Sequence, residues 1–232
     1  MDLDQLENNL KTTFSTAQRA FEYYYDIIMR LGDTGPGTKT IHNAGITILE
    51  PENNIISTPW RKWNHEYAEI EWLWYLSKDR SVKEISRHAK IWLSCADEFG
   101  NVNSNYGYQW NRNDQLDKVI ILLKTDRNTR RASISLYDGK EIDEYRHDTI
   151  CTYAVSFNIR DNFLHMTVMM RSNDLVYGFC NDQYCFSKLM LLVYRELLST
   201  YPTLLFGTYH HFVVDLHIYK KHFDMREKYT GV

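Results

Sequence analysis

The sequence predicts one α+β domain over residues 1–232, in which a β-sheet is flanked by helices. Residues 153–159 and 164–170 each alternate apolar with smaller or polar side chains, which is typical of a β-hairpin with one buried face. Between residues 114 and 124 the apolar side chains recur at i, i+3, i+4 and i+7 instead, which indicates an amphipathic helix. No repeat, low-complexity tract or linker divides the chain, so we assign both patterns to one domain.

The first half of the chain is expected to contain helices and one strand. Glycine commonly ends helices, so Gly32 is expected to close the first one, and the Gly- and Pro-containing segment after it is expected to be a loop. A Ser-x-x-Glu pattern favours the start of a helix. In order, the expected elements are a helical region over 3–31, a loop over Gly32–Lys39, a strand over Thr40–Leu49, a helix over 66–78 and a further helix that starts at Ser81–Glu84.

The second half is expected to be richer in strands. Residues 132–137 (ASISLY) form a short strand ahead of the hairpin. Asp161 and Asn162 supply the hairpin turn, because both residue types favour turns and tolerate left-handed backbone. A helix over 183–199 and a strand over 211–219 complete the domain.

Composition and charge restrict the class of protein. Hydrophobic residues make up 44% and charged residues 25%, as in ordinary soluble globular proteins. The formal net charge of −3 argues against a general nucleic-acid-binding protein, which is usually basic. No apolar run approaches the roughly 18–20 residues of a membrane helix, and no signal-peptide pattern opens the chain. We therefore expect a cytoplasmic protein with no membrane and no nucleic acid among its partners.

Two further motifs suggest phosphate or metal binding but fit neither. In residues 32–40 (GDTGPGTKT) the lysine is one residue out of register for a phosphate loop, and a strand is expected where that motif needs a helix. His210, His211, His217 and His222 lie on or just beyond one strand, without the accompanying Cys or carboxylate pattern of a zinc site. The sequence therefore predicts neither a phosphate loop nor a metal site.

Both strands of the predicted hairpin carry residues that suit a binding or catalytic role. Arg171 and Ser172 close an apolar strand, where a guanidinium and a hydroxyl together suit a phosphate. Cys151 begins the other strand; a thiol there is usually inert core, but nearby guanidinium groups would lower its pKa and make it a nucleophile. Arg130 and Arg131 follow a polar turn and are, taken alone, typical of a solvated surface.

Five segments, taken in order, form a longer pattern. They are N-Y-G-Y-Q-W (105–110), T-R-R (129–131), I-C-T (150–152), R-S-N-D-x-x-x-G-F-x-N-D (171–182) and H-I-Y (217–219). Their order and spacing, within about residues 65–224, resemble the thymidylate synthase superfamily. The resemblance implies a mixed β-sheet flanked by helices, and a homodimer in which two subunits pack sheet against sheet.

The resemblance also implies how a pyrimidine nucleotide monophosphate is bound. Cys151 matches the nucleophile that adds to C6 of the base, and Tyr106 matches a tyrosine beside it. Glu71, in E-W-L-W-Y-L, matches the glutamate that organises water and protons at the base. The remaining nucleotide-binding positions are Arg171, Ser172 and Asn173 in the phosphate motif, His217 and Tyr219 at the sugar hydroxyl, and Arg130 and Arg131, which the other subunit donates.

A folate is the implied cosubstrate, in the form of 5,10-methylenetetrahydrofolate. Trp92 and Asp174 match residues that line the folate side, and Gly178, in the same motif as Asp174, is assigned to that side too. The implied reaction transfers a one-carbon unit to C5 of the pyrimidine.

One departure from the synthases indicates the base. Asp182 stands where they carry an asparagine that faces the edge of uracil. Cytosine reverses that edge, because it offers an amino donor at N4 and an acceptor at N3. A carboxylate accepts from N4–H and also stabilises N3–H once addition at C6 has made N3 basic. Asp182 therefore predicts cytosine, in both binding and catalysis, and a base with the wrong edge would leave buried polar groups unpaired.

Further departures concern the product. Thr152 replaces the histidine after the cysteine, and Met170 replaces the glutamine before the clamp arginine; both resemble the deoxycytidylate hydroxymethylase branch. The sequence ends at Val232, whereas synthases continue to a tail that closes over folate, so water is expected to reach the intermediate and give a hydroxymethyl product.

Asp33 occupies the place of a phosphate-binding arginine, with Lys39 as a candidate substitute. A phage with modified DNA is the natural setting, which implies the host cytoplasm.

The resemblance and these departures favour a deoxycytidylate hydroxymethylase, and three alternatives to it stay open. One is a methylating enzyme on the same scaffold that acts on dCMP or dUMP. A second is a CMP 5-hydroxymethylase of nucleoside-antibiotic synthesis, which differs in its ribose. The third is a non-catalytic nucleotide- or RNA-binding protein. Retention of Cys151 and Glu71 argues against the third, because binding alone needs neither.

Overall fold

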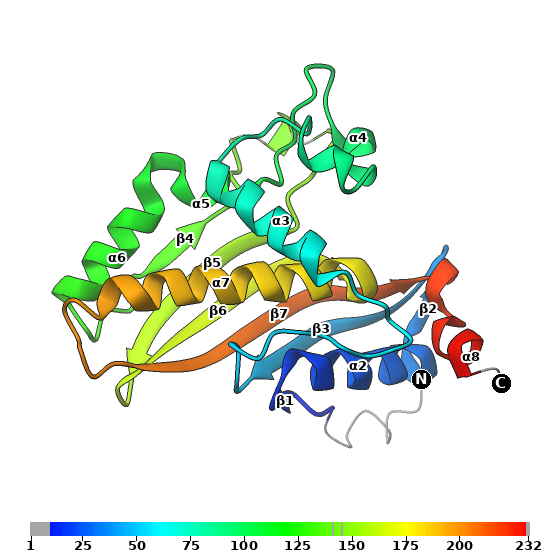
Figure 1. Ribbon diagram of the computed structural model, residues 1–232, viewed down its shortest axis with the longest axis horizontal. Helices are drawn as coiled ribbons and strands as arrows, with labels where there is room; N and C mark the ends of the chain where they lie inside the picture. The colour runs from blue at the N-terminus through cyan, green and yellow to red at the C-terminus, as the bar shows by residue number, and fades with distance from the viewer. Residues whose placement is uncertain (1–9, 141, 145, 231–232) are drawn as a thin grey trace.

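The strands form one mixed sheet, which lies behind the helices in Figure 1. The computed structural model describes residues 10–140, 142–144 and 146–230. The strand order is β1-β3-β7-β6-β5-β4, with β2 paired to β3. The β1–β3 and β6–β7 pairs are parallel and the others antiparallel, so the predicted α+β class with a mixed sheet is confirmed. The strands are β1 Thr13–Phe14, β2 Asp33–Gly35, β3 Thr38–Ile48, β4 Ser133–Ser135, β5 Thr152–Arg160, β6 Phe163–Asp174 and β7 Leu205–Tyr219.

Helices α2 and α7 pack on the sheet, and α3 and α6 pack against α7 (Figure 1). Within the described part of the chain no helix is long and apolar enough to cross a membrane. The α-helices are α2 Ala17–Leu31, α3 His65–Ser77, α4 Ile91–Cys95, α5 Tyr106–Asn111, α6 Gln115–Thr125, α7 Cys180–Leu197 and α8 Met225–Thr230. Shorter turns are the 3-10 turns η1 Ile85–Arg87, η2 Arg112–Asp114, η3 Ile142–Glu144 and η5 Lys220–His222, and the π-helical turn η4 Leu175–Phe179.

The two faces of the sheet differ in burial. One face is fully buried beneath the helices and includes Val155, Val168 and Val213. Side chains on the other face of β6 and β7, such as Met169 and Phe212, are only half-buried in the single chain. The alternation along each strand therefore leaves one sheet face covered and the other partly open.

The hairpin of β5 and β6 is confirmed, and its turn has the expected chemistry. Asp161 and Asn162 have φ angles of 48° and 67°. Two consecutive left-handed residues match the twist of antiparallel strands, and Asp and Asn tolerate that conformation. The helices over 66–78, 114–124 and 183–199 and the strand over 211–219 are also present, with shifted ends.

The predicted helical region over 3–31 is wrong at its start. Residues 3–9 lie outside the described residues, and residues 13–14 are a strand parallel to β3. Helix α2 begins only at Ala17, because the Thr16 side chain accepts from Arg19 N and caps it. The helix ends at Gly32, as predicted. A glycine fits there because a Cβ would lie 2.5 Å from Ile28 O.

The predicted loop over 32–39 is also wrong, because most of it is a hairpin. Asp33–Gly35 forms β2, which pairs with the start of β3. Gly37 has a φ of 80°, which a glycine adopts without strain and which closes the turn.

The helix predicted to start at Ser81–Glu84 is a 3-10 turn instead. Ser81 forms a β-bridge with Asn101, so its backbone is engaged before any helix can begin. Glu84 precedes η1 without a side-chain capping bond. The Ser-x-x-Glu pattern therefore carries no capping box here.

Candidate active site

The ends of β6 and β7 bring most of the candidate residues together. Residues Arg171–Asp174 end β6, and Asp174 lies opposite His217 on the parallel neighbour β7. Cys151 directly precedes β5 on the other side of β6, and its carbonyl accepts from Arg171 N over 2.8 Å. The predicted nucleophile, the predicted phosphate motif and the predicted sugar-side pair therefore lie at the same end of these strands.

A register shift places Arg171 beside Cys151. The hairpin pairs Ala154 with Met169, yet Thr152 with Met170, so one residue of β5 bulges. Arg171 Nη2 consequently donates to Cys151 Sγ over 3.5 Å. The same guanidinium also donates to two backbone carbonyls just before the cysteine, Ile150 O at 3.0 Å from Nε and Thr149 O at 2.9 Å from Nη2.

Burial keeps the Cys151 thiol protonated in the single chain. Desolvation raises the pKa of Cys151 to about 11, and the Arg171 guanidinium lowers it only in part. The charges of Asp182 and Asp148 raise that pKa further. Thiolate formation at neutral pH therefore calls for more positive charge than Arg171 alone provides.

Glu71, on α3, is a buried carboxyl with polar partners. Its Oε1 accepts from the Tyr75 hydroxyl over 3.2 Å, and its Oε2 accepts from Asn181 Nδ2 over 2.9 Å. Asn181 in turn accepts from Trp63 Nε1 over 2.8 Å. Burial, and then the charge of Asp182, raise the pKa of Glu71 to about 8. Such a carboxyl can exchange a proton at physiological pH.

Asp182, in the first turn of α7, is paired with Asn173. Asn173 Nδ2 donates to Asp182 Oδ2 over 2.7 Å. Burial raises the pKa of Asp182 to about 7, although the bond from Asn173 lowers it and the charge of Asp174 raises it. No described residue bonds to Oδ1, so this oxygen stays available.

Gly178 lies next to the Asn173–Asp182 pair. A Cβ on Gly178 would lie 2.6 Å from Asn173 Nδ2 and 3.3 Å from Asp182 Oδ2. Asp174 caps η4, where its two oxygens accept from Val176 N at 2.9 Å and Tyr177 N at 3.3 Å. The glycine thus leaves room for the Asn173–Asp182 bond.

Tyr106 and Trp92 line the helical side of the site. Tyr106 is buried, with its ring 5.6 Å from that of Phe186, and burial followed by the nearby Cys151 raises its pKa well above the usual range. Trp92, on α4, donates from Nε1 to the Tyr67 hydroxyl over 2.8 Å and packs its half-buried ring 4.9 Å from Trp74.

His217 and Tyr219 end β7 next to the phosphate motif. Their rings lie 5.0 Å apart, edge to face, and His217 Nδ1 is 3.0 Å from Asp215 Oδ1. Burial raises the pKa of Tyr219, and Asp174 and Cys151 contribute to that rise. Ser172 is half-buried and pairs with Asp215 across the two strands.

Arg130 and Arg131 do not reach this site in the same chain. Both are exposed and precede β4, where Phe157 N donates to Ala132 O. Arg131 therefore lies about seven residues along β5 from Cys151, or roughly 23 Å at the rise of a strand.

Lys39, the candidate substitute for the missing arginine, is engaged at the end of α2 in the single chain. Its Nζ donates to Met29 O over 2.6 Å and lies 5.7 Å from the centre of the Phe223 ring. It therefore stabilises the end of α2. Asp33 is half-exposed, and its Oδ2 lies 3.8 Å from His42 Nε2.

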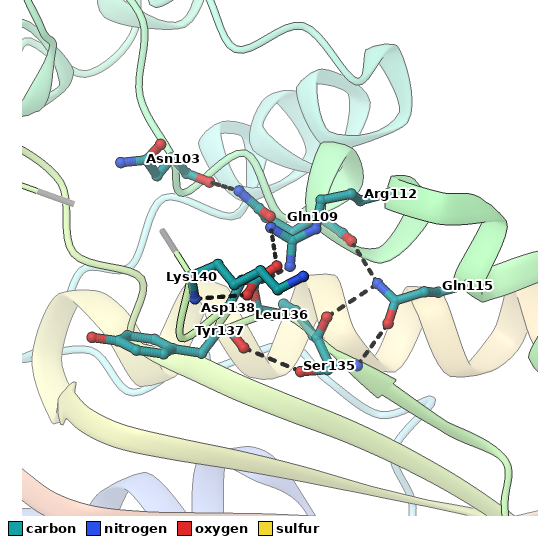
Figure 2. Close-up of polar contacts among 9 residues, drawn as sticks. All are labelled: Asn103, Gln109, Arg112, Gln115, Ser135, Leu136, Tyr137, Asp138 and Lys140. Atoms are coloured by element: carbon teal, nitrogen blue, oxygen red, sulfur yellow. Dashed lines mark hydrogen bonds and ion pairs between the residues drawn. The ribbon is translucent and has the colours of Figure 1, made fainter. Parts of the chain in front are cut away.

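Gln115 of α6 and Arg112 of η2 bind the edge strand β4 and the residue after it, as Figure 2 shows. The Gln115 side-chain amide makes two hydrogen bonds to the backbone of Ser135: Nε2 donates to Ser135 O and Oε1 accepts from Ser135 N, both over 3.0 Å. Arg112 Nη2 donates to Leu136 O over 3.1 Å, and its Nη1 lies 4.0 Å from Asp138 Oδ2.

A second set of bonds anchors the segment that enters Cys151. Asp148 accepts from Ser104 N at 2.6 Å and from Ser104 Oγ at 2.7 Å, and its carbonyl accepts from Asn103 Nδ2 at 3.0 Å. Gln109 Nε2 donates to Asn103 O over 2.8 Å, as Figure 2 shows. The segment of Cys151 is therefore held on both sides, by Arg171 and by Asp148.

Three side chains in the hydrogen-bond network of Glu71 were not assigned from the sequence: Asn181, Tyr75 and Trp63. Asn181 directly precedes Asp182 in the N-D pair, and Tyr75 is four residues after Glu71 on one helix face. Those spacings are signals that could have been used. Trp63 lies before α3, and nothing in the local sequence relates it to Asn181.

Cys151 lies beside the strand-end Arg171, and Glu71 on α3 and Asp182 on α7 are two carboxyls with raised pKa values. A thiol, a guanidinium and two such carboxyls on one mixed sheet and its helices suit a one-carbon transferase that acts on a pyrimidine nucleotide. The profile of the family described as thymidylate synthase matches residues 30–230, and the chain belongs to this family. Members are generally dimeric and bind a nucleotide and a folate.

Curated relatives include hydroxymethyltransferases of two nucleotides and thymidylate synthases. The deoxycytidylate 5-hydroxymethyltransferase of Enterobacteria phage T6 is 34% identical over 199 residues, 81% of this chain and 78% of the relative. The thymidylate synthase of Bacillus mojavensis is 28% identical over 180 residues, 73% of this chain and 62% of the relative. The deoxyuridylate hydroxymethyltransferase of Pseudomonas phage M6 is 28% identical over 163 residues, 68% of this chain and 46% of the relative.

Proposed function

We propose that the chain is a deoxycytidylate 5-hydroxymethyltransferase, which uses dCMP, 5,10-methylenetetrahydrofolate and water to form 5-hydroxymethyl-dCMP and tetrahydrofolate. The observation that carries the proposal is the state of Asp182: a half-buried carboxyl with one oxygen bonded to Asn173 and the other available. The relative with the same activity in its name, from phage T6, supports it.

The base edge follows from the chemistry of that carboxyl. With a pKa of about 7, Asp182 holds a proton in much of the population at neutral pH. A carboxylic acid donates from one oxygen and accepts at the other, which matches N3 and N4–H of cytosine. The ionised form accepts from N4–H and stabilises N3–H after addition at C6.

Cys151 is the proposed nucleophile. Its thiolate attacks C6, which makes C5 a carbon nucleophile, and the cosubstrate supplies the one-carbon unit that C5 attacks. Arg171 has two tasks, because it holds the cysteine segment and also lies where the phosphate of the nucleotide would bind, next to Ser172.

The missing positive charge would come from a second copy of the chain. Arg130 and Arg131 are exposed, and Arg131 is roughly 23 Å along the strand from its own Cys151. In a homodimer packed through the half-buried sheet face, they would reach the partner's site, bind the phosphate and lower the pKa of the partner's thiol. Met169 and Phe212 on that face suit such an interface.

Glu71 is the proposed base for the water step. Once the C5 proton has left and the bond from the new carbon to the folate nitrogen has broken, tetrahydrofolate is released and an exocyclic methylene remains on the base. Water adds to its carbon and passes a proton to Glu71, which Tyr75 and Asn181 hold in place. Breaking the C6–Sγ bond then restores the C5–C6 double bond and frees Cys151.

The residues on the folate side fit a flat heterocycle. The half-buried ring of Trp92 is flanked on α4 by Ile91 and Leu93, which are 64% and 60% exposed and offer apolar surface. Asp174 uses two acceptor sites for the η4 cap, and a carboxylate has two more for N–H groups of a ligand.

Tritium release from C5 tests the reaction class. The protein would be incubated with methylenetetrahydrofolate and, in parallel, 5-tritiated dCMP, CMP or dUMP. We expect release to be fastest from dCMP and lost in Cys151→Ser. Release no greater than in Cys151→Ser would support the binding protein and overturn the enzyme. Faster release from dUMP or CMP would overturn the assigned base or sugar.

A further inference from the structure

A chain of hydrogen bonds runs from the core of the sheet to Asp182. Tyr209 and His211, both fully buried on β7, begin it with a bond between the Tyr209 hydroxyl and His211 Nδ1. His211 Nε2 lies 3.1 Å from Asn173 Oδ1. Asn173, 4% exposed, then donates from Nδ2 to Asp182 Oδ2 over 2.7 Å. We call these four side chains the relay, Tyr209–His211–Asn173–Asp182. Of the four, only Asp182 takes part in the proposed reaction.

The relay is held in place by packing. The ring of Phe179 lies 5.3 Å from that of His211 at 83°, edge to face. Gly178 leaves space for the Asn173 amide, where any Cβ would lie 2.6 Å from Nδ2. The Asn173 amide has space next to Gly178, but its rotation would break the hydrogen bonds to His211 and Asp182.

Each bond in the relay fixes the direction of the next. Burial lowers the pKa of His211 to about 3, so the ring carries one proton. Tyr209 has no other acceptor among the described residues, so a ring proton on Nδ1 would leave the Tyr209 hydroxyl hydrogen buried and unbonded, which is costly. Tyr209 therefore donates to Nδ1 and His211 donates from Nε2. Asn173 must accept with Oδ1, and its Nδ2 then faces Asp182.

We propose that this relay is the positioning device for base choice: it keeps Asp182 Oδ2 as an acceptor and leaves Oδ1 to carry the proton or face the base. The inference rests on the proposed function, because it explains how the same site selects cytosine. An N–H donor favours an unprotonated carboxyl oxygen, so the order of donor and acceptor on Asp182 is set. Cytosine and uracil present donor and acceptor in opposite order, so a set order discriminates between them.

Binding of dCMP and dUMP to the unmodified chain and to relay variants tests the proposal. Isothermal titration calorimetry gives the ratio of the two Kd values without need of turnover. His211→Phe keeps a ring but removes both nitrogens, and Tyr209→Phe removes one hydroxyl. His211→Gln restores an acceptor for Tyr209 and a donor for Asn173. Tyr194→Phe, which loses a bond to Leu204 O instead, is the matched control.

We expect the preference for dCMP to fall about tenfold or more in His211→Phe, to fall in Tyr209→Phe, and to return in His211→Gln. The control is expected to match the unmodified chain. Circular dichroism and Tm establish that each variant is folded. An unchanged ratio in folded His211→Phe, or an equal loss in Tyr194→Phe, would overturn the relay.

Product analysis of the unmodified chain, carried out beside these titrations, separates this inference from the proposed function. If the unmodified chain prefers dCMP but forms no hydroxymethyl product, the proposed reaction fails and the relay is judged by the variants alone. If the unmodified chain binds dUMP as tightly as dCMP, the assigned base and the relay fail together.

Discussion

The guanidinium of Arg171 donates to the thiol of Cys151 over 3.5 Å and, through two further bonds, holds the backbone that precedes it. One side chain thus sets both the position and the charge environment of the proposed nucleophile. Because burial raises the pKa of this thiol to about 11, Arg171 is the main opposing influence within the chain.

Arg171→Gln is expected to raise the pKa of Cys151 further and to slow its alkylation. Iodoacetamide reacts with the thiolate, so the rate at pH 8–9 should fall several-fold, to be measured by peptide mass spectrometry. Cys95, also half-buried, serves as the internal control and should react as before. An unchanged rate at Cys151 would mean that Arg171 has no electrostatic role there.

Glu71 should make the protein less stable as pH rises. Its pKa is about 8 in the folded chain, against the ordinary glutamate value of 4.5, which applies to the unfolded chain. Between pH 4.5 and 8 the folded chain therefore holds a proton on Glu71 that the unfolded chain has lost. The free energy of unfolding therefore falls from about pH 4.5 to 8. Glu71→Gln should remove this decline, so its Tm advantage over the unmodified chain grows across that range.

Glu69→Gln, on the same helix, is the matched control for that titration. Burial raises the pKa of Glu69, but bonds from Lys188 and Tyr184 outweigh it and lower the pKa overall. Its contribution to stability is therefore complete above about pH 5 and constant at higher pH. A Tm difference for Glu71→Gln that stays flat from pH 5 to 8 would contradict the raised pKa.

Mixed dimers test the sharing of arginines. Cys151→Ala and Arg131→Ala should each be inactive alone, but mixing them under exchange conditions should restore part of the activity. The mixed dimer contains one complete site, with Cys151 from one subunit and Arg131 from the other. If both residues acted within one subunit, no mixture would regain activity.

Asp182→Asn is expected to reverse base preference. An amide can accept from N3–H and donate to O4 of uracil, whereas it lacks the acid's match to cytosine. We expect kcat/KM for dCMP to fall by about 100-fold or more, and the ratio for dUMP over dCMP to rise. Asp117→Asn, exposed on α6, makes the same change outside the site and should leave both rates unaltered.

Gly178→Ala should disturb the Asn173–Asp182 pair. Its Cβ would lie 2.6 Å from Asn173 Nδ2, so the amide must move or the backbone must shift, at a cost of about 1–3 kcal/mol. Urea denaturation and dCMP turnover should both show a loss. Gly139→Ala, where a Cβ meets nothing within 4 Å, should change neither; a similar loss there would point to a general effect of the substitution.

Much of the sheet was predictable because its signals are local. Alternation over 153–170 and the Asp161–Asn162 turn indicate the hairpin, and a two-residue turn nearly determines which residues face each other. The register shift before Ala154 is not visible in the alternation, yet it places Arg171 rather than Ser172 beside Cys151.

Other features depend on contacts distant in the sequence. The strand at 13–14 exists because β3 offers it backbone partners, and the helical pattern that follows hides its start. His211 has the alternation of a buried strand residue, and its bond to Asn173 arises only when β6 and β7 pair. Local propensity cannot report such pairings.

The measurement that tests the central claim most directly is mass spectrometry of the product formed from dCMP, methylenetetrahydrofolate and the protein in water enriched in oxygen-18. We predict 5-hydroxymethyl-dCMP as the main product, with one oxygen-18 atom in the new hydroxyl and no product from Cys151→Ala. A methylated product, or a product from dUMP alone, would contradict the account.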